Sequence, residues 1–274
     1  MGRLGKLCLC GGVLVCLATR GLSGAPPPEG KWVTAVDLHT LLKSILPQDA
    51  ILRDPYVERR GVTCGLVQDG KWIGQVTLGV FGDTRAADAP FEEHLRFTSI
   101  SPPPEPVASL GQQTVRWGKK RVLWQRDNAV VDMSLPESLI EPAAVALDKA
   151  LAAGTCGVRR GATAPVPQIT EVKVPPTMTG GTAVPAEIVV ELPREANGEY
   201  LGVADSYGIS VVRHVAPGAP QRVRAVYSVC FTPNRVKERT EVTHWICYAT
   251  RGCVVAPAKA VTLVVLPERK EDQK

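Results

Sequence analysis

Two cysteines near the carboxyl end of the chain have a spacing that suits disulfide chemistry. Cys247 and Cys253 are separated by five residues that include Gly252, and a turn there can bring both thiols of a hairpin face to face. Closing so short a loop stabilises a fold by only about 2 to 2.5 kcal/mol. Thiol-disulfide exchange is a second option, because the neighbouring Arg251 favours a thiolate. The sequence leaves three states open: a structural disulfide, a redox-active pair and two free thiols.

The first 25 residues have the pattern of an export signal. A basic start at Met1–Lys6 precedes the apolar stretch Leu7–Ala18, and Ser23–Ala25 supplies small residues for cleavage. The apolar stretch is shorter than the ~20 residues that a membrane-spanning helix needs. A lipid-modified cysteine would follow a small residue, whereas Cys16 follows Val15. We therefore expect a signal peptide at 1–25, a secreted or periplasmic mature protein, and no transmembrane span in the mature chain.

Removal of the signal leaves an odd number of cysteines. The signal holds three of the eight cysteines, so five remain in an oxidising compartment and one should stay unpaired. A bond between Cys64 and Cys156 would close a long loop, which is worth about 4.5 kcal/mol. We predict disulfides between Cys64 and Cys156 and between Cys247 and Cys253, with Cys230 as the free thiol.

The choice of Cys230 rests on strand alternation. Within the run Arg222–Phe231, Tyr227 and Phe231 belong to the more apolar set, and Cys230 falls on the other face with Val226. Cys230 should therefore point away from the core.

Cys247 is predicted to lie on the inward face of its strand. In the run Glu241–Thr250 it shares a face with Trp245, whose bulk argues that this face is inward. Two cysteines on opposite faces of a sheet cannot bring their β-carbons within the ~4 Å of a disulfide, which disfavours Cys230 as the partner unless a bulge near Cys230 reverses its face. Cys253 is the remaining choice.

Residues 31–158 are expected to form a two-layer α+β domain, an antiparallel sheet with helices. The turn Asp69–Lys71 is the strongest hairpin signal in the chain. Apolar residues at helical spacing, with proline or glycine at the ends, predict helices over Val36–Leu46 and Pro142–Ala153 and a short one over Pro90–Arg96. Strands are predicted over Gly61–Gln68, Trp72–Phe81, Thr114–Trp117, Val122–Arg126 and Ala129–Leu135.

The pattern changes beyond residue 158. Residues 159–168 lack periodicity and hold two prolines, so they are expected to be a linker. Residues 169–267 hold short apolar or alternating runs bounded by Pro, Gly and Asn, which predicts an all-β immunoglobulin-like sandwich. Residues 268–274 form a charged tail. The predicted strands are Ile169–Val174, Ala186–Leu192, Ile209–Arg213, Arg222–Phe231, Glu241–Thr250 and Ala260–Leu266.

The carboxyl-terminal pattern resembles a known family. Cys247 and Cys253 at this spacing, then Pro257, then the strand Ala260–Leu266, look like the immunoglobulin-like amino-terminal periplasmic domain of the thiol:disulfide interchange protein DsbD. The resemblance covers about the last 100 residues. It implies that Cys247 and Cys253 pass reducing equivalents to thioredoxin-like periplasmic partners.

Several other motifs lack the sequence context that their usual function needs. Gly65–Lys71 has the spacing of a phosphate-binding loop, but Trp72 replaces the hydroxyl residue that would hold magnesium. Glu92 and Glu93 are adjacent on a helix and point about 100° apart, which suits a solvated face better than shared catalysis. The segment Gly154–Gly161 carries two arginines that could meet an anion, although an exposed loop is the simpler interpretation.

The histidines do not predict a metal site. None of the four has an acidic residue at ligand spacing, and His39 falls on a polar helix face. His244 and Cys247 are three apart in a predicted strand, so they point to opposite faces unless a bulge intervenes. We expect no metal and no cofactor.

Charge and composition argue against nucleic acid as a partner. Loss of Arg3, Lys6 and Arg20 with the signal lowers the formal net charge from +5 to +2, and aromatic residues are only 5%. No nucleophile, base and orienting group recur at a recognisable spacing. The expected function is protein interaction in the cell envelope, without a catalytic site of the protein's own. The alternative is thiol-disulfide exchange through Cys247 and Cys253 with a thioredoxin-like partner.

Overall fold

The computed structural model describes most of the chain, namely residues 32–53, 56–58, 61–97, 105–107, 109–161, 167–193, 201–204, 210–213, 222–250 and 254–268. The predicted signal at 1–25, residues 269–274 of the predicted tail, Cys253 and His214 lie outside these residues.

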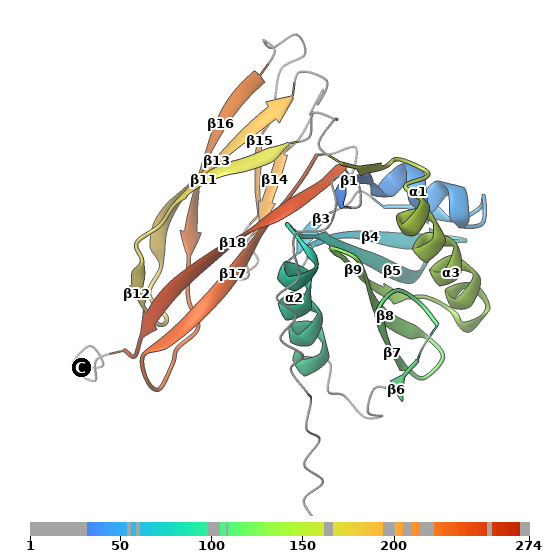
Figure 1. Cartoon of the computed structure of the whole chain (residues 1–274), viewed down its shortest axis with the longest axis horizontal. Helices are drawn as coiled ribbons and strands as arrows, with labels where there is room; N and C mark the ends of the chain where they lie inside the picture. Colours follow the sequence, from blue (N-terminus) through green and yellow to red (C-terminus); the bar gives the residue numbers. More distant parts are fainter. Residues whose placement is uncertain are drawn as a thin grey trace, which may run out of the picture.

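The described chain is mostly β, with antiparallel sheets and three helices (Figure 1). The helices are α1 (Leu38–Ile45), α2 (Thr84–Phe97) and α3 (Glu137–Ala153). All three lie within residues 31–158, where the sequence predicts helices, and α2 and α3 begin earlier than predicted. Pro90 and Pro142 both lie inside their helices.

An eight-stranded antiparallel sheet forms the centre of the amino-terminal part, in the order β2-β4-β5-β9-β8-β7-β6 with β3 also paired to β4. Its strands are β2 (Ile51–Leu52), β3 (Tyr56–Glu58), β4 (Gly61–Gln68), β5 (Lys71–Val80), β6 (Glu105–Pro106), β7 (Gln113–Trp117), β8 (Arg121–Arg126) and β9 (Ala129–Ser134). The predicted hairpin β4-β5 is confirmed, and its turn residues Asp69 and Gly70 have φ of 51° and 72°. Positive φ at both positions is the turn geometry that favours Asp-Gly.

Helices α1 and α3 cover one face of this sheet (Figure 1). Their apolar stripes meet the inward residues of β4, β5, β8 and β9 in the largest buried cluster of the described residues. Its members include Leu41, Leu66, Leu78, Trp124 and Leu147. Helix α2 lies on the opposite face, where Phe91 is buried in a second cluster.

A second sheet joins the two halves of the chain. It has the order β10-β1-β18-β17-β14-β15, with β12 added in parallel to β18. Its strands are β1 (Val33–Asp37), β10 (Val158–Arg160), β12 (Thr177–Thr179), β14 (Leu201–Ala204), β15 (Ser210–Arg213), β17 (Thr240–Thr250) and β18 (Val254–Leu266). Strand β1 lies between β10 and β18, and Val36 pairs with both Val158 and Val255. One sheet therefore contains strands from both predicted domains.

The predicted linker at 159–168 begins inside β10 and ends at the first residue of β11. Strand β10 pairs with β1, so its residues belong to the joining sheet. Residues 162–166 lie outside the described part of the chain.

A three-stranded sheet completes the carboxyl-terminal part. It consists of β11 (Gln168–Lys173), β13 (Val184–Pro193) and β16 (Arg222–Phe231), in that order. Side chains from this sheet and from β17 and β18 share a third buried cluster, which includes Ile188, Tyr227, Phe231, Ile246 and Tyr248. The two sheets therefore pack face to face in this part of the molecule.

Candidate functional site

Cys247 lies between the two parts of the molecule. It is 2% exposed and belongs to the buried cluster of α2 and the eight-stranded sheet, with Phe81, Phe91 and Ala258. The ring of Trp245, two residues earlier in β17, meets Phe81 edge-on at 5.3 Å between centroids. Burial of Cys247 is as predicted, but the buried cluster it joins is not the carboxyl-terminal core. That core is faced by the other side of β17, and Cys247 points to the amino-terminal part.

A bulge in β18 lies opposite Cys247. Ile246 pairs with Lys259 and Tyr248 with Ala256, so Cys247 lies opposite two residues of β18, Pro257 and Ala258. Proline has no N–H to donate to the ladder, and it occurs in sheets mainly at edges and bulges. The irregularity places Ala258 and Cys247 in the same buried cluster.

The surroundings of Cys247 disfavour a thiolate. Burial raises the pKa of this thiol to about 12, since no charge compensates for the loss of water. A thiol with that pKa is a poor attacking group at neutral pH. Cys253 lies outside the described residues, so the predicted bond to Cys247 stays a prediction.

The structure separates the other cysteines by their exposure. Cys230 is exposed, on the face of β16 that also exposes Val226, while Tyr227 and Phe231 are buried. The predicted strand alternation at Cys230 is thus confirmed. Cys64 is buried in β4 and belongs to the core cluster under α1 and α3. Cys156 is exposed in the turn after α3. The predicted bond between Cys64 and Cys156 stays a prediction.

A buried polar group in the amino-terminal part escaped the sequence motifs. His94 in α2 is 4% exposed, and its Nδ1 lies 3.1 Å from Oδ2 of Asp132 in β9. Arg121 in β8 donates to both oxygens of the same carboxylate, from Nε at 2.9 Å and from Nη2 at 2.5 Å. The guanidinium of Arg121 also lies 5.0 Å from the ring centre of Trp117. The three polar side chains come from three separate elements, so no local spacing could predict the group.

Asp132 has an unusually acidic carboxyl group. Burial by itself would raise its pKa, but hydrogen bonds from His94 and Arg121 outweigh the burial and lower the pKa to about 2. The carboxylate is therefore charged at every physiological pH. Its bonds tie α2 to the sheet through His94 and to β8 through Arg121.

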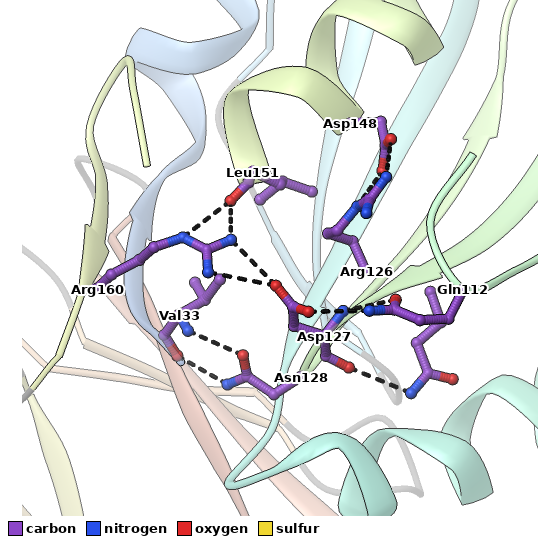
Figure 2. Close-up of polar contacts among 9 residues, drawn as sticks. Val33, Gln112, Arg126, Asp127, Asn128, Asp148, Leu151 and Arg160 are labelled. Atoms are coloured by element: carbon purple, nitrogen blue, oxygen red, sulfur yellow. Dashed lines mark hydrogen bonds and ion pairs between the residues drawn. The ribbon is translucent and has the colours of Figure 1, made fainter. Parts of the chain in front are cut away.

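The turn between β8 and β9 carries a second polar group, which Figure 2 shows. The side chain of Asn128 is buried, accepts from the N–H of Val33 at 2.9 Å, and donates to the carbonyl oxygens of Val33 and Phe81. Asp127 accepts from the backbone-paired Arg160 and from Gln112. Arg126 beside them donates to Asp148 of α3. This turn thereby holds β1, β5, β10 and α3 in fixed relation.

The anion-binding interpretation of Gly154–Gly161 loses one of its two arginines. The Arg160 guanidinium donates to the carbonyl oxygen of Leu151 near the end of α3 and forms an ion pair with Asp127 (Figure 2). Such a contact satisfies a carbonyl at a helix end. Arg160 therefore acts in the fold rather than as an open anion site.

The remaining sequence motifs lie in a hairpin or in buried clusters of the fold. Gly65–Lys71 runs through the β4-β5 hairpin, so a phosphate loop entering a helix is absent there. His244 is buried against the ring of Phe231, whereas Cys247 belongs to a different cluster. Within the described ranges, no three His, Cys, Asp or Glu side chains gather into a group that could hold a metal ion.

One surface feature was not predicted as a site. Ile51 and Trp72 are 61% and 55% exposed, the two highest values among the exposed large apolar side chains of the described residues. Both pair with Val67, Ile51 from β2 and Trp72 from β5, so the three side chains share a face of the sheet. We call Ile51, Val67 and Trp72 the indole patch.

The exposed indole of Trp72 packs on Gly65 of β4. A β-carbon at Gly65 would lie 2.1 Å from the far edge of the Trp72 ring, so the ring covers the glycine closely. The ring of the exposed Trp72 thus packs over the backbone of Gly65, two positions before Val67. A strand glycine marks a place of such close approach.

Searches against protein-family models and curated protein sequences find no match for this chain. Among the described residues, no helix has the length and apolar character that crossing a membrane requires.

Proposed function

We propose that the protein is exported and acts by protein interaction in the cell envelope, without a catalytic site of its own. The observation that carries the proposal is the indole patch, where Ile51 and Trp72 are exposed on either side of Val67 and the Trp72 ring packs over Gly65. Tryptophans of this kind dominate the energy of protein interfaces. Exposed large apolar side chains that flank one another on a sheet also cost solubility, so Ile51 and Trp72 favour a role in binding.

The charges around the indole patch support an uncharged partner segment. Two acidic residues, Asp49 and Asp69, are exposed near it, and so are two basic residues, Arg53 and Lys71. The charges at the rim of the patch therefore cancel. A balanced rim gives no long-range attraction to nucleic acid or to an acidic surface. The occupant that fits best is an apolar side chain of an extended protein segment, placed between Ile51 and Trp72.

A finer fold assignment belongs with this proposal. We propose the immunoglobulin-like sandwich for residues 169–267, which is supported by the shared core of the three-stranded sheet with β17 and β18. Domains of this class commonly serve as interaction modules, which is an argument from fold analogy alone.

Thiol-disulfide exchange through Cys247 and Cys253 is the second candidate, supported by the resemblance to the DsbD periplasmic domain. Burial of Cys247 disfavours this thiol as the attacking group, so we assign the first attack in such a reaction to Cys253. An insulin-reduction assay with wild type and Cys247→Ala tests this candidate. A trapped mixed disulfide at Cys253 would establish exchange and overturn the non-catalytic proposal.

The interaction proposal has a direct test by photo-crosslinking. A photoreactive phenylalanine replaces Lys71, next to Trp72, in the cells that produce the protein, and the crosslinked segment is sequenced. The control places the same residue at Val145, an exposed apolar position on α3. We expect one protein segment to crosslink at position 71, to be lost with Trp72→Ala, and to be absent at position 145. Equal crosslinking at both positions, or no effect of Trp72→Ala, would contradict the proposal.

A further inference from the structure

One row of residues runs across the eight-stranded sheet, on the face that α2 partly covers. Cross-strand pairing joins one residue from each of five strands, in the order Gly65, Gln75, Ser134, Arg121 and Trp117. Their strands follow one another as β4-β5-β9-β8-β7 (Figure 1). The alternate residues Val76, Met133 and Val122 belong to the core under α1 and α3, so the row lies on the opposite face. We call these five residues the cross-strand row.

The cross-strand row is partly open to solvent. Its four larger side chains are each partly exposed, namely those of Gln75, Ser134, Arg121 and Trp117. Helix α2 covers the neighbouring row instead, where His94 bonds to Asp132. At the other end of the cross-strand row, the ring of Trp72 packs over Gly65. Two tryptophans therefore flank the polar centre of this row.

The centre of the row is rich in hydrogen-bond donors and has no net charge. Gln75 and Ser134 are neutral, and neither side chain is seen in a hydrogen bond with another described residue. Arg121 donates from Nε and Nη2 to Asp132, which compensates its charge and leaves the Nη1 amino group as a further donor. A ligand that suits these side chains is uncharged and rich in acceptors.

A proline-rich segment meets both requirements. Its carbonyl oxygens accept hydrogen bonds, its prolines have no N–H that needs an acceptor, and its rings pack on aromatic side chains. The four gaps between the five strands give the row a length of ~19 Å, which ~6 residues of a polyproline II helix span at ~3.1 Å each. An added β-strand fits less well, because it binds to the backbone at a sheet edge and this row lies on a sheet face.

We propose that the partner segment at the indole patch is proline-rich, adopts the polyproline II conformation and continues along the cross-strand row from Trp72 to Trp117. Proline rings pack on both indoles, and the carbonyl oxygens between them accept from Gln75 and Ser134. The inference rests on the proposed function, in which a protein segment binds at Trp72. It adds the composition, the conformation and the direction of that segment.

The composition of the segment can be tested by titrating the full mature chain with capped decaproline, followed by NMR. A capped decapeptide of alternating glycine and serine is the control. We expect a dissociation constant below about 1 mM for decaproline and binding at least about tenfold weaker for the control, because polyproline II is preformed in the first peptide only. Equal affinity for the two peptides, or no binding of decaproline, would overturn the proposal.

Two glutamines supply a matched pair of variants. Gln113 lies on the same face of the sheet as Gln75, but it is two rows away and pairs with Gln125. We expect Gln75→Ala to weaken decaproline binding by about fivefold and Gln113→Ala to leave it within about twofold. Equal effects of the two changes would contradict the cross-strand row. Trp117→Ala should weaken binding by at least about tenfold, and if this variant fails to fold, the glutamine pair decides.

The results also separate this inference from the proposed function. A segment without proline that crosslinks at position 71, or binding that needs Trp72 but not Gln75, would leave the indole patch as a protein-binding site and overturn the proline-rich segment. Absence of any crosslink that depends on Trp72 would contradict the proposed function, and this inference with it.

Discussion

The two parts of the molecule are held together by different kinds of interaction. The amino-terminal part has exposed ion pairs such as Lys119 with Glu137, but it also has largely buried ones, as with Arg121 and Asp132, whose carboxylate side chain is 13% exposed. In the carboxyl-terminal part, the pairs lie in solvent, as with Lys173 and Glu187, which are 52% and 50% exposed. Buried pairs fix geometry and are costly to break, whereas exposed pairs contribute little. The first part should thus tolerate less change at its polar residues than the second.

Strand β1 offers the strongest way to break the distinction between the parts. Val36 pairs with both β10 and β18, so Val36→Pro removes ladder bonds from the middle of the joining sheet. We expect the free energy of unfolding to fall by about 4 kcal/mol or more, measured by urea titration. Tryptophan fluorescence and thiol exposure at Cys247 should both report the loss. A variant in which only the amino-terminal part is destabilised would show that the parts are independent.

Asn128 tests how much the polar group at the β8-β9 turn contributes. The change Asn128→Ala leaves the backbone groups of Val33 and Phe81 buried without this partner. We expect a loss of about 3 kcal/mol in the free energy of unfolding. Gln112→Ala is the matched control, because it removes exposed bonds to the same turn and should cost below about 1 kcal/mol. Equal losses in the two variants would refute a special role for the buried amide.

The dependence of stability on pH should distinguish the buried ion pair of Asp132 from the exposed pair of Glu187. The pKa of Asp132 is lowered from 3.8 to about 2 in the folded state, so its contribution is full above pH 4 and is lost as the pH falls towards 2. We expect Asp132→Asn to lower the free energy of unfolding by about 2 kcal/mol at pH 6, with the difference from wild type shrinking below pH 4. Glu187→Gln should cost less than about 0.5 kcal/mol at either pH. A pH-independent effect of Asp132→Asn would contradict the assignment.

Local sequence signals predicted the elements that depend on local chemistry. The Asp69-Gly70 turn fixes the β4-β5 hairpin because its backbone conformation belongs to those two residues. Strand β1 was missed, and its last two residues were assigned to the following helix. Its extended form depends on partners in β10 and β18, which lie far along the chain. Propensity in so short a run cannot reveal such partners.

In the candidate sites, too, the sequence predicted only what depends on local signals. Alternation within β16 correctly placed Cys230 outward, since one face of that strand meets the core. For β17 both faces are buried, so the bulk of Trp245 could not tell which neighbour Cys247 would meet. His94 and Asp132 are separated by 38 positions, and only the packing of α2 on the sheet brings them together. The indole patch escaped notice because exposure of Trp72 is a property of the assembled sheet.

Strand β1 also bears on the order in which the chain folds. Of the described strands it is the first to be synthesised, and its neighbour β18 is the last. The joining sheet cannot close until almost the whole chain has left the ribosome or the export channel, since contacts of long sequence separation form late. Until then the newly made β1 has one unpaired edge, the kind of edge to which chaperones and other chains bind. Completion of the fold is therefore a late event that waits for the arrival of β18.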